Sequence, residues 1–353
     1  MPTASSPLAR RSVRVMLTLA LGLAAALLFR SLHTPLPWML GPLIATGLAC
    51  VAGAPLVAAP GLRNAGQWAI GTALGLYFTL PVVAVVARLG APIVAGIVWA
   101  LLLGAGFGAF LKRANRGNPA LDRPTLFFAS AIGGATEMAV LAERHGGRID
   151  LVASAHSLRL LIVVVVIPFT FQFAGLHGLD PFLPGPRVVD PGGLVLLALL
   201  TLAGAGAMRR LGLSNPWALG PLAVAFALTA SGIELSALPV ELTNAAQLFI
   251  GVALGTRFTP AFLHSAPRWL ASVAIGTLAM LLLSAAYAGA VARLWDLHPA
   301  TVLLGTSPGG IAEMCITAKV LQLGVPVVTA FHVTRMAAVV LLAGPLYRWR
   351  AAG

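Results

Sequence analysis

Long apolar segments separated by short polar stretches make up almost the whole chain. In the first half they lie near residues 14–32, 37–54, 64–87, 91–111 and 150–173, and in the second half near residues 191–208, 215–232, 243–259, 269–291 and 326–347. A helix needs roughly 20 apolar residues to cross a bilayer. The pattern predicts an all-α integral membrane protein with about five spans in each half.

Two further apolar segments, residues 124–143 and 300–321, are each interrupted by a pair of glycines. The pairs are Gly133 with Gly134 and Gly309 with Gly310. Glycine weakens a helix, and free backbone groups at membrane depth persist only where they are buried in protein or line a watery cavity. We therefore expect one broken helix in each half of the chain.

The two halves carry the same four short motifs in the same order. The motif PW-x-LGPL begins at Pro37 and again at Pro216, and NA-x-Q begins at Asn64 and Asn244. The motif GG-x-x-EM begins at Gly133 and Gly309, and H-x-x-R begins at His156 and His332. Corresponding positions are 176 to 180 residues apart. This predicts two homologous membrane repeats, residues 1–174 and 191–353, joined by a linker at residues 175–190 that is rich in Gly, Pro and Asp.

Composition agrees with a membrane protein and argues against a nucleic-acid partner. Hydrophobic residues make up 59% of the chain and charged residues only 9%. The net charge of +13 comes from Lys and Arg residues scattered between apolar segments, whereas a nucleic-acid-binding protein gathers them on one basic face. Cys50 and Cys315 have no CxxC or His partner spacing, so we expect neither a disulfide framework nor a zinc site.

Positive charge also predicts the topology. Arg10, Arg11 and Arg14 precede an apolar run from Val15 to Phe29, which we interpret as an uncleaved first span and not as a secretory signal. Arg159 and Arg335 are left out of the count as intramembrane. With both termini inside and both broken segments re-entrant, the other Lys and Arg residues number 16 inside and 5 outside, whereas broken segments that cross the membrane give 12 inside and 9 outside. This favours inverted repeats in a bacterial inner membrane, with both termini cytoplasmic.

Charged residues within the apolar segments are the candidate site. Ionisable groups in lipid are costly and are usually retained for function. Glu137 and Glu313 would lie in the first turn after each break, where each could bind a coupling cation or carry a proton, or could merely cap its half-helix.

A histidine and an arginine share one helix face in each half, His156 with Arg159 and His332 with Arg335. The arginines could clamp a substrate carboxylate or phosphate, or could form internal salt bridges with Glu137 and Glu313. The histidines could relay protons or simply pack.

Two amide pairs complete the predicted substrate- or ion-binding residues. Asn64, Gln67, Asn244 and Gln247 could face the site, although capping of a helix is the default role of the asparagines. No metal ligands and no cofactor are predicted.

Together these duplicated motifs closely resemble the AbrB membrane protein family over nearly the full chain. A small DNA-binding transition-state regulator of Bacillus shares that name and does not resemble this sequence. The resemblance implies an association with regulation of gene expression through aidB. Family members are also labelled as an ammonia monooxygenase.

We expect a secondary transporter of a small solute, with an anion favoured, coupled to protons or another cation. The alternative is a membrane-bound ammonia monooxygenase-like metalloenzyme, which would need convergent ligands, whereas only His156 and His332 of the seven histidines look intramembrane. The expected partners are the lipid bilayer and the solute, with a second copy of the chain as a further candidate and no nucleic acid.

Overall fold

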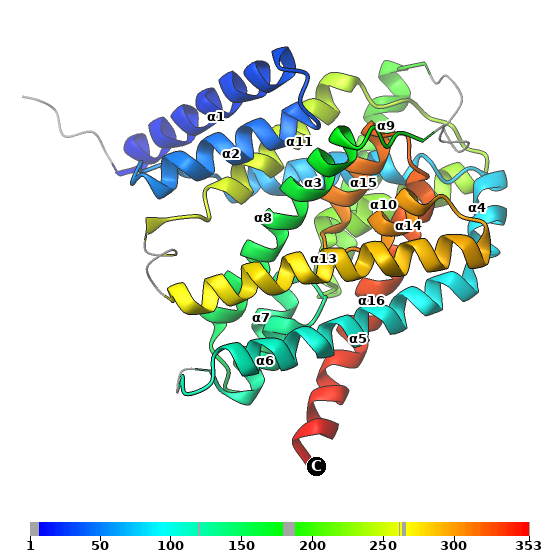
Figure 1. Ribbon diagram of the computed structural model, residues 1–353. Helices are drawn as coiled ribbons and strands as arrows, with labels where there is room; N and C mark the ends of the chain where they lie inside the picture. The colour runs from blue at the N-terminus through cyan, green and yellow to red at the C-terminus, as the bar shows by residue number, and fades with distance from the viewer. Residues whose placement is uncertain (1–6, 119–120, 179–187, 261, 263–265, 353) are drawn as a thin grey trace, which may run out of the picture. The chain divides into compact units, whose positions relative to one another are not determined.

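The computed structural model describes residues 7–118, 121–178, 188–260, 262 and 266–352. Every regular element in this part of the chain is an α-helix. The predicted linker at 175–190 lies partly outside it, because residues 179–187 are not described. The helices, with the labels of Figure 1, are α1 (Pro7–Ser31), α2 (Pro37–Val51), α3 (Pro60–Gly75), α4 (Leu80–Ala87), α5 (Gly90–Ala114), α6 (Arg123–Ser130), α7 (Ala135–Arg144), α8 (Ile149–Phe173), α9 (Pro191–Arg210), α10 (Pro216–Ala230), α11 (Val240–Gly255), α13 (Pro267–Trp295), α14 (Pro299–Thr306), α15 (Ile311–Val320) and α16 (Val325–Ala352).

Within the described residues, six helices are long and apolar enough to cross a membrane, or seven if α3 and α4 count as one span. The six are α1, α5, α8, α9, α13 and α16. The protein is therefore a multi-pass membrane protein. The helices α2, α10 and α11 are apolar but shorter, at 15, 15 and 16 residues, so three of the predicted spans fall below the usual crossing length.

Two predicted boundaries were wrong. The segment predicted as one span over residues 64–87 is divided into α3 and α4 by a turn after Gly75. A proline in the first turn starts both helices, Pro60 in α3 and Pro81 in α4. Proline suits this place because its missing N–H would have no intrahelical partner. The capping role expected for the asparagines is also wrong. The helix α3 begins four residues before Asn64, and α11 begins at Val240, four residues before Asn244, so neither asparagine caps a helix.

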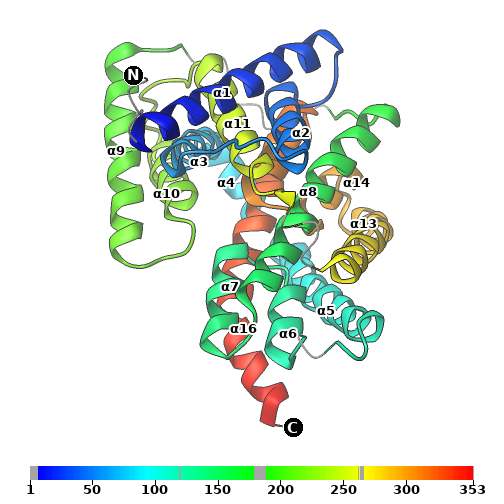
Figure 2. The ribbon, with the colours of Figure 1, turned by 90° about the vertical axis from the view of Figure 1, so that its left-hand side faces the viewer.

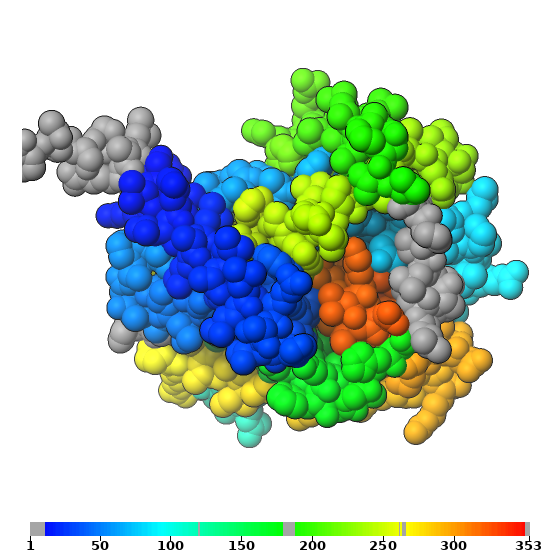
Figure 3. Space-filling view, turned by 90° about the horizontal axis from the view of Figure 1, so that it is seen from above, coloured from blue at the N-terminus to red at the C-terminus, as the bar shows by residue number. Residues whose placement is uncertain are grey.

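The chain forms two compact units, and each takes helices from both halves of the sequence. The first unit contains residues 1–76, 186–228 and 233–265, hence α1, α2, α3, α9, most of α10 and α11. Here α1 lies beside α2, as Figure 2 also shows. Much of the surface of α1 is exposed, and its residues are drawn in dark blue in Figure 3.

Glycines allow the helices of the first unit to approach closely. A Cβ at Gly71 would collide with the carbonyl of Ala218, and a Cβ at Gly251 would collide with that of Met39. The first contact sets α3 against α10 and the second sets α11 against α2. Small residues at such crossings are how membrane helices pack tightly.

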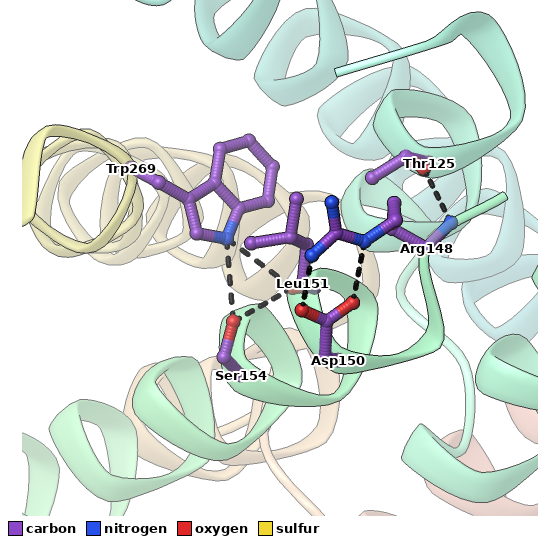
Figure 4. Close-up of polar contacts among 6 residues, drawn as sticks. All are labelled: Thr125, Arg148, Asp150, Leu151, Ser154 and Trp269. Carbon is purple, nitrogen blue, oxygen red and sulfur yellow. Dashed lines mark hydrogen bonds and ion pairs between the residues drawn. The ribbon is translucent and has the colours of Figure 1, made fainter. Parts of the chain in front are cut away.

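The second unit contains residues 77–185, 229–232 and 266–353, hence α4 to α8 and α13 to α16. Trp269 of α13 is fully buried, and its indole Nε1 donates to the carbonyl of Leu151 at 3.2 Å and to Ser154 Oγ at 3.3 Å, which fixes α13 to α8. Figure 4 shows this contact beside the start of α8, where the backbone N–H of Arg148 donates to Thr125 Oγ1 at 2.7 Å. Long helices and broken helices are thus held together in one body.

Candidate functional site

The predicted interruptions are present in both broken segments. Residues 131–134 separate α6 from α7, and residues 307–310 separate α14 from α15. The backbone is extended at the end of each break, with φ −66° and ψ 136° at Gly134 and φ −84° and ψ 156° at Gly310. Each break leaves carbonyl groups of the first half-helix and N–H groups of the second without helical partners.

In the first half, Arg159 and His156 of α8 bind the carbonyl end of α6. The guanidinium donates to the carbonyl of Ala131 at 3.0 Å and to that of Ala129 at 3.4 Å. His156 Nε2 lies 2.9 Å from the carbonyl oxygen of Phe128, and its Nδ1 lies 2.8 Å from Arg159 Nη2. We call this arrangement of His156 and Arg159 on three carbonyls the first clasp.

In the second half, Arg335 and His332 of α16 form the same arrangement at the end of α14. Arg335 donates to the carbonyls of Ser307 at 2.5 Å and Gly309 at 2.9 Å. His332 Nε2 lies 2.8 Å from the carbonyl oxygen of Leu304, and its Nδ1 lies 2.9 Å from Arg335 Nη2. We call this the second clasp.

The contacts define the state of both histidines. A guanidinium can only donate, so each Nδ1 accepts a hydrogen bond. Each Nε2 must then carry the proton that it donates to the carbonyl oxygen of Phe128 or Leu304. In this arrangement both imidazoles are neutral, and each holds its arginine in place.

The clasps also bring positive charge to the negative ends of two helix dipoles. Cations near a helix C-terminus are stabilising, and α6 and α14 end at the carbonyls that the arginines bind. All four clasp side chains are buried, with Arg159 3% and Arg335 6% exposed. Leu160 of α8, next to Arg159, lies 3.4 Å from where a Cβ of Gly310 would be, so the helix of the first clasp packs against the break of the second half.

The glutamates lie at the start of the second half-helices, as predicted. Glu137 is in the first turn of α7 and Glu313 in the first turn of α15, and both are half-buried. Each carboxylate folds back over a glycine of its own break, because a Cβ at Gly134 would overlap Glu137 Oε2 and a Cβ at Gly310 would overlap Glu313 Oε2. Negative charge at a helix N-terminus is favourable.

The other glycine of each pair faces neighbouring side chains. A Cβ at Gly133 would meet Met138 Cε and Val339 Cγ1, both at 3.0 Å, and a Cβ at Gly309 would meet Met314 Cγ at 2.7 Å. Val339 belongs to α16, so the first break packs against the long helix of the second half. Within the described residues, no ion pair joins Arg159 to Glu137.

The amide residues belong to the first unit. Asn64 and Gln67 lie on α3, and Asn244 and Gln247 lie on α11, where the two helices cross with Gly66 against the carbonyl of Ala246. The predicted site residues therefore fall into two sets. The glycines, glutamates, histidines and arginines lie together in the second unit, and the four amides lie in the first.

The carbonyl acceptors of the clasps were missed in the sequence. They are backbone atoms of Phe128, Ala129, Ala131, Leu304, Ser307 and Gly309. A side-chain motif cannot report them, although the glycine pair that follows each half-helix marks where free carbonyls occur.

The described residues do not fit a metal cluster. They contain no group of three or more His, Cys, Asp or Glu side chains that could hold a metal ion. The histidines of the clasps already bind a carbonyl and a guanidinium. A copper or iron cluster needs several convergent ligands, and this part of the chain does not provide them.

Comparisons with known proteins place the chain among membrane proteins of one family. The family described as "Transition state regulatory protein AbrB" matches residues 38–351. "Uncharacterized protein YhjN" of Bacillus subtilis (strain 168) is 27% identical over 342 residues, covering 88% of this chain and 86% of its own. "Putative regulator AbrB" of Escherichia coli (strain K12) is 26% identical over 330 residues, covering 92% of each chain. No solved structure matches the chain significantly.

Proposed function

Since the chain belongs to the AbrB family and spans the membrane several times, we propose that it is a secondary transporter of a small solute. The observation that carries this proposal is the pair of clasps. Two broken helices, each held by a buried histidine and arginine, meet in one compact unit. Broken helices with charged groups at midplane are the common architecture of secondary transporters.

The matched geometry supports inverted repeats as the basis of this site. Both first half-helices have 8 residues and both second half-helices have 10. The same side-chain nitrogens form both clasps, and the histidines bind carbonyls at corresponding positions, Phe128 and Leu304, whereas the carbonyls bound by Arg335 lie two positions further along than those bound by Arg159. The distribution of Lys and Arg favours opposite orientations of the two copies.

Glu137 and Glu313 are the proposed coupling groups. They lie beside the breaks and are half-buried, whereas the N–H groups of both arginines that face the breaks are bound to carbonyls and histidines. This leaves the carboxylates as the groups best placed to take up a proton or cation. The arginines then position the backbone of the breaks.

Uptake into proteoliposomes tests the proposal directly. A panel of radiolabelled metabolites is offered with and without an imposed proton gradient. At least one solute should accumulate above empty liposomes, and Glu137→Gln and Glu313→Gln should reduce its uptake to that background while purifying like the wild type. Glu143→Gln, which changes an exposed glutamate at the end of α7, is the control and should transport normally.

Normal uptake by Glu137→Gln and Glu313→Gln would contradict the coupling role of the carboxylates. If the wild type takes up no solute of the panel, the transport function is contradicted. The monooxygenase alternative is tested by metal analysis of the purified protein, where stoichiometric copper or iron would favour it. Any effect on gene expression is proposed to be indirect, through the concentration of the solute.

A further inference from the structure

A cavity of about 610 Å³ lies beside the first break, within the second unit. It is bounded by the end of α5, residues 115–118, Leu121, α6 and Tyr347 of α16. Lys112, Arg116 and Arg123 line it, and none of the described lining residues is acidic. Its volume falls in the range of small-molecule sites, so a charged metabolite would fit.

The cavity leads from exposed cations to the break. Lys112, Arg116 and Arg123 are exposed, whereas Ser130, the last residue of α6, is buried and lines the same cavity. A Cβ at Gly108 of α5 would lie 2.8 Å from Ser130 Oγ, so the glycine allows the hydroxyl of Ser130 to lie close to α5. The next residue is Ala131, whose carbonyl is bound by Arg159.

The walls of the cavity are held by specific contacts. Asn115 Nδ2 donates to the carbonyl of Leu111 at 3.0 Å and to Ser272 Oγ of α13 at 2.8 Å. Tyr347 packs its ring against Phe127 at 5.3 Å and His145 at 4.8 Å between centroids. The walls that α5, α6 and α16 contribute are thus fixed by contacts with their neighbours.

Two of the three lining cations have no basic counterpart in the second half. The connection between α13 and α14 contains only residues 296–298. At the spacing of the duplicated helices, Lys112 corresponds to Gly289 and Arg123 to Pro299, and only Arg116 has a basic counterpart, Arg293. These cations are therefore not required by the shared scaffold of the two halves.

We propose that this cavity is the entrance through which a small phosphate- or carboxylate-bearing solute reaches the first break. The inference rests on the proposed transport function and assigns its substrate class. Asp122 beside Arg123 accepts a hydrogen bond from the backbone N–H of Thr125, so the three lining cations outnumber this one carboxylate. Clustered cations raise the local concentration of anions, and Lys and Arg bind carboxylate and phosphate directly. The headgroup of an anionic lipid carries the same chemistry, so the test must separate the two sources.

The test measures charge-selective access to the base of the cavity. Cys50 and Cys315, both buried, are replaced by alanine, and Ser130→Cys introduces one thiol. The thiol is modified in neutral detergent with anionic 2-sulfonatoethyl or cationic 2-(trimethylammonium)ethyl methanethiosulfonate, with each rate divided by that for a free thiol. We expect the anionic reagent to be favoured by about tenfold. Leu126→Cys gives a second labelling position if the first variant does not fold.

The combined variant Lys112→Gln, Arg116→Gln, Arg123→Gln should reduce the preference to near one. A variant with Arg113→Gln and Arg144→Gln, which alters exposed cations that do not line the cavity, should keep it. Inorganic phosphate or succinate should slow labelling of the parent protein. The proposal would be overturned if the cationic reagent labelled the parent protein as fast as the anionic reagent, or faster, after division by the free-thiol rates.

Liposomes with and without phosphatidylglycerol separate the two sources of anion. Protection by this lipid with none by phosphate or succinate would show a lipid site and overturn the solute entrance. Labelling does not require transport, so the two proposals fail separately. Charge-selective labelling without uptake of any solute would support an anion site and contradict the transport function. Uptake without charge-selective labelling would contradict only the proposed entrance.

Discussion

The arginine and histidine of each clasp act as one unit at the scale of single residues. The imidazole accepts a hydrogen bond from the guanidinium at Nδ1, and its Nε2 donates to a carbonyl that the guanidinium does not bind. A buried polar group without a partner is costly, and here backbone carbonyls accept from both terminal nitrogens of each guanidinium and from Nε2 of each imidazole. The sequence spacing H-x-x-R is what places the two side chains on one face.

Arg159→Lys and Arg335→Lys should each destabilise the protein by about 2–4 kcal/mol. Lysine has a single ammonium group and cannot bind two carbonyls and the imidazole in the planar geometry of arginine. The measurement is thermal unfolding of the purified protein in detergent. Arg144→Lys, on an exposed arginine at the end of α7, is the control and should unfold like the wild type. Equal unfolding temperatures for all three variants would contradict the clasp.

At the scale of elements, the glycine pairs both interrupt the helix and make room for a carboxylate. Gly134 and Gly310 have negative φ angles that alanine also adopts. What they lack is a Cβ, and its place is taken by the carboxylate of Glu137 or Glu313. An added Cβ at either position would therefore displace the carboxylate rather than strain the backbone.

Gly134→Ala and Gly310→Ala should displace the carboxylates and reduce uptake as strongly as the Glu→Gln variants, with helical content unchanged. Adding Glu137→Gln to Gly134→Ala should cause little further loss, because the two changes act on the same group. The measurements are uptake and circular dichroism. Gly106→Ala is the control, since a Cβ there meets nothing within 4 Å. Normal uptake with Gly134→Ala and Gly310→Ala would show that the carboxylate positions do not matter.

Much of this element pattern could be predicted from the sequence. The breaks followed from Gly133–Gly134 and Gly309–Gly310, because two adjacent glycines weaken a helix even within an apolar run. The division of α3 from α4 was missed although Gly75 and Pro81 flank it, since the apolar run continues through the turn. The acceptors of the clasps could not be predicted, because packing of α8 on α6 brings backbone atoms of distant residues together.

At the scale of the whole molecule, neither half of the sequence forms a compact unit of its own. The first unit combines α1 to α3 with α9, α10 and α11, and the second combines the remaining helices of both halves. The four motifs of each half are thereby distributed over two units. Residues at corresponding positions of the two halves, such as Arg159 and Arg335, lie in the same unit.

The predicted topology places both chain ends in the cytoplasm. In a background without Cys50 and Cys315, an impermeant maleimide should label Ser31→Cys in intact cells and Arg348→Cys only after permeabilisation. Both positions are exposed, and the distribution of Lys and Arg puts the end of α1 outside and the end of α16 inside. The reverse pattern would invert the orientation and move the basic cavity to the outer face.

The clasps have a mechanical consequence. Three hydrogen bonds join α8 to the end of α6 and the break after it, and three join α16 to the end of α14 and the break after it. In lipid no water replaces them if they break. Sliding of a half-helix along its long helix is therefore resisted at both places. A motion that opens the breaks first to one side of the membrane and then to the other must move α6 with α8, and α14 with α16, as rigid pairs.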